Sequence, residues 1–157
     1  MSKALIVFNA SHRGTRLAAE EIARGISREG RVATIVSSVE EVSAEKLEAS
    51  GIVVLGSPAS LRDATREVHE LTSILPAGAL DRKTVSVFDA GPGFRHGAGA
   101  QKLRDSLREV DPNLHLASPG ISVVFDRHHG GLPEEEVSRC RQFGEHLAGL
   151  AFARGSA

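Results

Sequence analysis

The sequence predicts one α/β domain over residues 1–153, followed by a loose tail over residues 154–157. In this domain a five-stranded parallel sheet is covered by helices on both faces. Short apolar runs alternate with amphipathic stretches along the whole chain, as they do where helices connect parallel strands. One run, residues 52–55, is apolar at every position, which is typical of a strand covered on both faces.

Five segments have the length and the β-branched content of buried strands. They are residues 4–8, 31–36, 52–55, 83–88 and 121–125, with residues 114–116 as an interrupted piece ahead of the last strand. Small and polar residues follow the first, third and fourth segments, so we expect each of these strands to end in a loop.

Apolar residues at helical spacing predict the helices between these strands. We expect Thr15 to cap the first helix and Ser43 a short second one, and we expect the last helix to start at Pro133 ahead of three acids. The predicted buried stripes of the long helices are Ala18, Ile22 and Ile26; Leu61, Ala64, Val68, Leu71 and Leu75; Leu103, Leu107 and Val110; and Val137, Cys140, Phe143, Leu147 and Leu150. Cys140 is therefore expected to pack in the core rather than to act as a nucleophile.

The composition excludes several classes of protein. A net charge of −1 provides no basic surface for nucleic acid. No stretch approaches the roughly 18 apolar residues of a membrane span, and the first apolar run is too short for a signal peptide. A single cysteine forms neither an internal disulfide nor a CxxC redox pair. We therefore expect a cytoplasmic protein without a membrane span.

Residues 3–23 have the order strand, polar loop, helix. Such a loop directs free backbone N–H groups at one point, where the helix dipole adds partial positive charge. Asn9, Ser11 and Thr15 supply amide and hydroxyl groups around Gly14, and Arg13 offers a counter-charge. These features favour a phosphate site, and an ordinary strand-to-helix turn is the alternative.

The loops after the first, third and fourth strands are expected to meet, because ligands of parallel α/β sheets bind beyond the carboxyl ends of the strands. The last of these loops contains Gly91, Gly93, Gly97 and Gly99. Glycine costs conformational entropy on folding, so this density is unexpected in a purely structural connection. We therefore expect this loop to approach a ligand closely.

Three motifs resemble those of the flavodoxin family. Residues 11–15, SHRGT, resemble its FMN phosphate loop with one residue missing between the glycine and the threonine. Residues 53–58, VVLGSP, resemble its second flavin loop, and residues 88–94, FDAGPGF, resemble the loop at the other edge of the flavin. The resemblance covers nearly the whole chain and implies a flavodoxin-like three-layer sandwich with strand order 2-1-3-4-5.

The resemblance also implies FMN as the cofactor. The residues that it places around FMN are Asn9, Ser11, His12, Arg13, Gly14 and Thr15; Ser57, Pro58, Ala59 and Ser60; and Asp89, Ala90, Gly91, Gly93, Phe94, Arg95 and His96. The chain departs from the family at Ser60, where an aromatic residue usually stacks on the flavin, and it contains no Trp or Tyr. Phe94 is expected either to shield the ring or to plug the loop onto the core, with Arg95 or His96 near the pyrimidine side.

The resemblance and the three loops together predict an FMN-binding protein that acts in electron transfer or as a small flavin-dependent oxidoreductase. Its partner would be a redox protein or a small-molecule electron acceptor. The alternative is a flavin-free binding module that recognises a protein or another phosphate-bearing ligand. A homodimer formed across a helix face is an alternative to a monomer.

Metal and nucleophile chemistry is not expected. No set of carboxylates or cysteines at ligand spacing accompanies His12, His96, His128 and His129. Ser57 does not lie in a Gly-x-Ser-x-Gly motif, so a nucleophile elbow is absent from the sequence.

Overall fold

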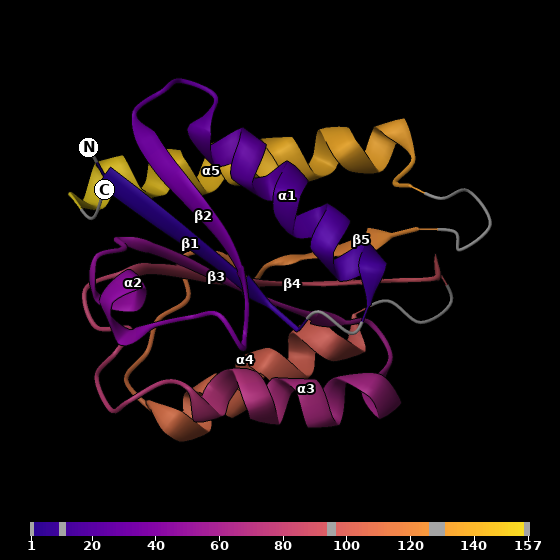
Figure 1. Cartoon of the computed structure of the whole chain (residues 1–157), viewed down its shortest axis with the longest axis horizontal. Helices are drawn as coiled ribbons and strands as arrows, with labels where there is room; N and C mark the ends of the chain where they lie inside the picture. The colour runs from indigo at the N-terminus through magenta and orange to yellow at the C-terminus, as the bar shows by residue number, and fades with distance from the viewer. Residues whose placement is uncertain (1, 10–11, 94–96, 126–130, 156–157) are drawn as a thin grey trace.

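A computed structural model describes residues 2–9, 12–93, 97–125 and 131–155. Five strands form one sheet in the order β2-β1-β3-β4-β5, and every neighbouring pair is parallel (Figure 1). The strands are β1 (Ser2–Phe8), β2 (Val32–Ser38), β3 (Ile52–Pro58), β4 (Thr84–Gly91) and β5 (Ile121–Val124). The predicted class and strand order are confirmed.

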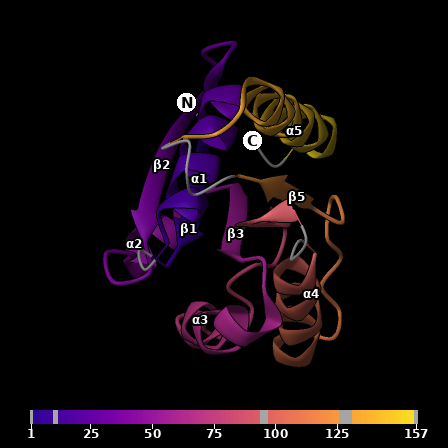
Figure 2. The ribbon, with the colours of Figure 1, turned by 90° about the vertical axis from the view of Figure 1, so that its right-hand side faces the viewer.

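Helices cover both faces of this sheet. They are α1 (Arg13–Ser27), α2 (Ala44–Glu48), α3 (Leu61–Ser73), α4 (Ala98–Val110) and α5 (Glu134–Arg154). Seen nearly along the strands, α1 and α5 lie on one face of the sheet and α3 and α4 on the other (Figure 2). None of the helices in the described ranges is long and apolar enough to cross a membrane.

Two hydrophobic cores result from the alternation of side chains along the strands. In β1, Ala4, Ile6 and Phe8 point into the core beneath α1 and α5, whereas Leu5 and Val7 point into the core above α3 and α4. All five are at most 3% exposed. Both faces of the strand are covered, which explains why its sequence is apolar without interruption.

β3 and β4 extend further at their carboxyl ends than the sequence indicated. Residues 56–58 and 89–91 were expected to lie in loops, but they continue β3 and β4, with Ser57 opposite Asp89 and Pro58 opposite Ala90. β1 pairs with β3 only as far as Gly56, so Pro58, which lacks an N–H, lies beyond the last paired residue on that side. The interrupted strand expected at 114–116 is not formed; Leu114 and Leu116 instead pack against the second core.

Helix boundaries follow the prediction in part. Ser43 caps α2 as expected, because its Oγ accepts a hydrogen bond of 3.1 Å from the backbone N–H of Lys46. The expected N-cap Thr15 lies inside the first turn of α1, whose N-cap is His12. Val110 is 45% exposed at the end of α4 and does not belong to the core. Arg154 was expected in the tail, but it ends α5.

Candidate functional site

The carboxyl edge of the sheet brings three connections together. They follow β1, β3 and β4 and lead into α1, α3 and α4, as expected for a binding edge in a parallel sheet. The second and third connections are joined by backbone hydrogen bonds, from the N–H of Ala59 to the carbonyl of Ala90 (2.9 Å) and from the N–H of Gly99 to the carbonyl of Ala59 (3.0 Å). The first connection reaches α3 through the side chains of Asn9 and His12.

Packing or backbone conformation accounts for three of the four glycines at the end of β4 and in the connection that follows it. A Cβ at Gly91 would lie 2.7 Å from the Cβ of Ala59, and a Cβ at Gly99 would overlap the carbonyl oxygen of Pro58. Gly97 is the N-cap of α4 and has a φ of 96°, which side chains rarely adopt. Only Gly93 is exposed, with Val124 Cγ1 3.5 Å from an added Cβ. The glycine density therefore has structural causes at Gly91, Gly97 and Gly99, and of these four only Gly93 lies where neither packing nor φ requires glycine.

The predicted residues of β3 and β4 form the scaffold of the site. The side chains of Ser57, Pro58, Ala59, Asp89 and Ala90 are buried. The Oδ2 of Asp89 accepts a hydrogen bond of 2.9 Å from the backbone N–H of Ala100, so this carboxylate holds the start of α4 against β4. Ser57 Oγ donates to the carbonyl of Pro58 at 2.7 Å. These buried side chains therefore fix the conformation of the connections after β3 and β4.

Ser60, which stands where the flavodoxin family has an aromatic residue, is the N-cap of α3. Its Oγ accepts a hydrogen bond of 3.3 Å from the backbone N–H of Asp63 and donates one of 2.8 Å to the carboxylate of the same residue. Both hydrogen bonds of the hydroxyl are thus made within the first turn of α3.

Four predicted residues, Ser11, Phe94, Arg95 and His96, lie outside the described residues.

The first turn of α1 presents an unsatisfied polar environment. Its N-cap, His12, makes no side-chain capping bond, and the turn contains no acid. The hydroxyl of Thr15 is fully buried and has no hydrogen-bond partner among the residues that the structure describes. An unpaired buried hydroxyl costs about 1–3 kcal/mol, and an anion at this helix end would offer it an acceptor.

The neighbours of Thr15 occupy different environments. Gly14 lies directly under the ring of Phe125, which follows β5, and any Cβ at residue 14 would overlap that ring. The side chain of Arg13, the predicted counter-charge, is exposed. The close approach of Phe125 therefore requires glycine in this turn, whether or not a ligand binds there.

Sequence reasoning missed two acids beside this turn. Glu67 Oε1 lies 3.5 Å from the Nε2 of His12, and Glu70 accepts a hydrogen bond from the side-chain amide of Asn9. Both acids line a hollow of about 340 Å³, whose walls are Asn9, His12, Glu40, Arg62, Asp63, Arg66, Glu67 and Glu70. Glu67 lies at helical spacing from the buried Ala64 and Leu71, and this position could have indicated that its carboxylate faces inward.

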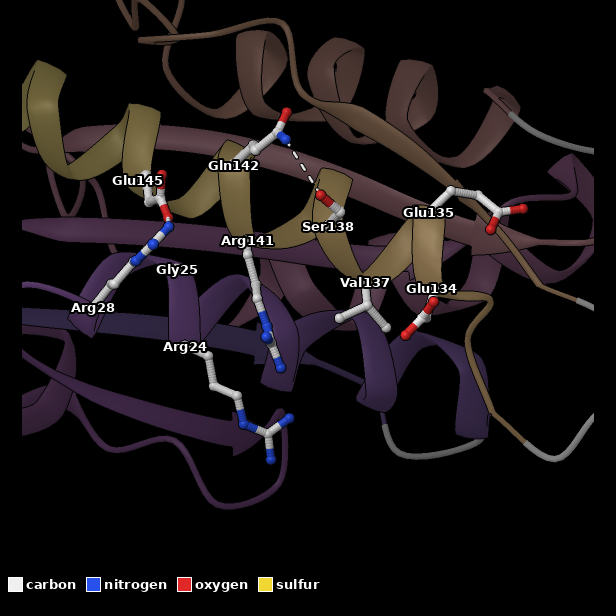
Figure 3. A pocket seen from close by; sticks show the side chains of 10 residues that line it. All are labelled: Arg24, Gly25, Arg28, Glu134, Glu135, Val137, Ser138, Arg141, Gln142 and Glu145. Carbon is white, nitrogen blue, oxygen red and sulfur yellow. Dashed lines mark hydrogen bonds and ion pairs between the residues drawn. The ribbon is translucent and has the colours of Figure 1, made fainter.

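A second hollow, of about 920 Å³, lies between α1 and α5 (Figure 3). Several of its charges are paired, Arg28 with Glu145 and Arg141 with Glu21, the latter at 2.7 Å. The two helices touch through their backbones at the floor of this hollow, because a Cβ at Gly25 would overlap the carbonyl of Arg141. Its ion pairs and backbone contact are those of a helix-packing surface, so we do not assign the candidate chemistry to it.

Neither a metal centre nor a nucleophile emerges from the described part of the chain. No group of three or more His, Cys, Asp or Glu residues is arranged there to hold a metal ion. Burial, with a further contribution from Glu136, raises the pKa of the Cys140 thiol to about 12. The thiolate is therefore negligible at neutral pH, and Cys140 is a core residue, as the sequence predicted.

Comparison with known proteins gives the fold its name. No protein-family model and no curated protein sequence matches the chain. Among solved structures, a flavodoxin from the domain Archaea is 19% identical with a TM-score of 0.70, over 94% of this chain and 96% of that one. The flavodoxin of Streptococcus pneumoniae TIGR4 is 20% identical with a TM-score of 0.67, over 94% and 99% of the two chains. The protein therefore has the flavodoxin-like fold.

The same fold occurs as part of longer proteins. The rubredoxin oxygen:oxidoreductase of Desulfovibrio gigas has a TM-score of 0.72 and 14% identity, and it is matched over 100% of this chain but only 38% of its own length. The chain is thus similar both to free-standing flavodoxins and to one portion of this larger protein.

Proposed function

We propose that the protein binds FMN at the carboxyl edge of its sheet, with the phosphate at the N-terminus of α1, and that it serves in electron transfer or as a small flavin-dependent oxidoreductase. The observation that carries the proposal is the buried hydroxyl of Thr15 in the first turn of α1, which has no hydrogen-bond partner among the described residues. A phosphate oxygen would accept a hydrogen bond from this hydroxyl while the helix dipole stabilises its charge.

The residues of this edge supply hydrogen-bond donors that suit FMN. Thr15 and the backbone N–H groups of the first turn would hold the phosphate, and the connections after β3 and β4 would border the ring through Ser60 and Gly93. Ser11, Phe94, Arg95 and His96 remain predicted contacts. FMN, when bound, supplies one- and two-electron redox chemistry, and the chain orients and shields it. Electrons would then pass to a redox protein or a small-molecule acceptor.

A flavin-free binding module is the second candidate function, and two observations favour it. The aromatic residue that usually stacks on the flavin is replaced by Ser60, which caps α3. The carboxylate of Glu67 also lies next to the N-cap of α1, where it disfavours an anion. Stacking contributes about 0.5–1.5 kcal/mol beyond area burial, so its loss weakens flavin binding without abolishing it. We therefore keep the FMN proposal first.

Replacing Thr15 with Val tests the phosphate position. The change removes a hydroxyl that would bond a charged group, an interaction worth about 1.5–3 kcal/mol, so the dissociation constant for FMN should rise more than tenfold. The ligand-free protein should be as stable as the wild type or more so, because the lost hydroxyl has no partner among the described residues. Fluorescence titration with FMN and thermal unfolding without it measure the two effects.

Thr84→Val is the matched control. Thr84 is also fully buried with an unpartnered hydroxyl in the described structure, but it lies at the start of β4, at the opposite edge of the sheet. This variant should bind FMN like the wild type. An unchanged dissociation constant in Thr15→Val would place the phosphate elsewhere.

A further inference from the structure

The strongest unassigned feature is the buried carboxylate beside the N-terminus of α1. The side chain of Glu67 is only 7% exposed and lies 3.5 Å from the Nε2 of His12, the N-cap of α1. A helix N-terminus that binds an anion ordinarily faces hydroxyls, amides or cations. Here an acid from α3 lies against the N-cap side chain, and both residues line the hollow of about 340 Å³.

The second acid of the hollow, Glu70, is more exposed than Glu67. Glu70 accepts from the amide of Asn9 and pairs with the guanidinium of Arg66 at 3.3 Å, and its side chain is 35% exposed. Glu67 lies against the imidazole of His12 and is buried more deeply. Deeper burial also means weaker screening by water and salt, so Glu67 should have the larger effect on an anion at α1.

We propose that Glu67 is a specificity-determining residue of the phosphate site: its carboxylate opposes the phosphate of FMN at the N-terminus of α1 and engages His12, which the phosphate would otherwise contact. This inference rests on the proposed function. Its consequence is a reduced preference for phosphorylated over unphosphorylated flavin, because the repulsion acts on the phosphate and not on the ring.

Glu67→Gln keeps the size of the side chain and removes its charge. Dissociation constants for FMN and for riboflavin, which lacks the phosphate, would be measured by fluorescence titration of the full chain. We expect the variant to bind FMN about tenfold more tightly or better, and riboflavin as the wild type does. Glu70→Gln should have a smaller effect. Glu109→Gln, exposed in the last turn of α4, is the matched control and should change neither constant.

Two outcomes would overturn the proposal: FMN affinity unchanged or lower in Glu67→Gln, or equal tightening of FMN and riboflavin, which would indicate a general effect on the fold. Thermal unfolding of each ligand-free variant verifies folding. If Glu67→Gln does not fold, Glu67→Ala replaces it, because alanine is a strong helix former in α3. The same changes in FMN and riboflavin affinity are expected of this variant.

Inorganic phosphate separates this inference from the proposed function. If no variant takes up FMN or riboflavin, the proposed function fails, and the melting temperature is then measured against added phosphate. A larger phosphate-induced rise in Glu67→Gln than in the wild type would still support opposition of an anion by Glu67. Equal rises, or none in either protein, would overturn it.

Discussion

Gly99→Ala is expected to lower the free energy of unfolding by about 3 kcal/mol, because overpacking against rigid backbone is seldom relieved by small shifts. The added Cβ would overlap the carbonyl oxygen of Pro58 and lie 2.6 Å from Ser57 Oγ. Relief requires the start of α4 to move away from β3, which would stretch the bond of 3.0 Å from the Gly99 N–H to the carbonyl of Ala59.

Urea denaturation measures this effect, and Gly149→Ala is its matched control. Gly149 lies on the exposed face of α5, and apart from its own helix backbone and chain neighbours no described residue comes within 4 Å of an added Cβ. There the same change should stabilise the protein by about 0.5–1 kcal/mol, since alanine is the better helix former. Equal stability of Gly99→Ala and the wild type would contradict the docking of α4 on the β3–α3 connection.

Asp89→Ala should cost about 2–3 kcal/mol of stability. It removes the acceptor of the Ala100 N–H bond at 2.9 Å and leaves a cavity at a fully buried position. The N-cap of α4, Gly97, has no side chain that could replace this bond. Asp89→Asn keeps an acceptor oxygen for the Ala100 N–H and should therefore cost less than Asp89→Ala.

The same denaturation experiment with Asp105→Ala provides the comparison for Asp89. Asp105 is exposed on α4, and among the described residues its carboxylate contacts the surface side chains of Gln101 and Arg108, so its removal should change stability by less than about 0.5 kcal/mol. Similar losses at both positions would show that the buried carboxylate does not hold α4 in place.

The sequence predicted the fold well because its signals are periodic. The unbroken apolar character of residues 52–55 reflects a strand covered by α1 and α5 on one face and α3 and α4 on the other. Strand ends were less predictable, because Gly56 and Gly91 resemble loop residues. In the structure they are strand residues whose missing side chains make room for Phe88 and Ala59. The need for this space arises from tertiary packing, so no local sequence pattern indicates it.

The candidate site could be predicted in its location but not in its electrostatics. The polar residues around Gly14 indicated an anion-binding turn, and Thr15 lies there unpartnered among the described residues. The acid facing this turn, Glu67, comes from another helix, and the arrangement of α3 beside the first loop decides the contact. Motif spacing within one loop carries no information about such a neighbour.

Uptake of FMN by the purified protein tests the central claim most directly. The protein, stripped of bound small molecules and held at tens of micromolar, would be titrated with FMN while free and bound flavin are separated and quantified. We expect saturation at one flavin per chain, with binding weakened more than tenfold by Thr15→Val and unaffected by Thr84→Val. Failure of the wild type and of Glu67→Gln to retain any flavin under these conditions would contradict the account and leave the flavin-free binding module in its place.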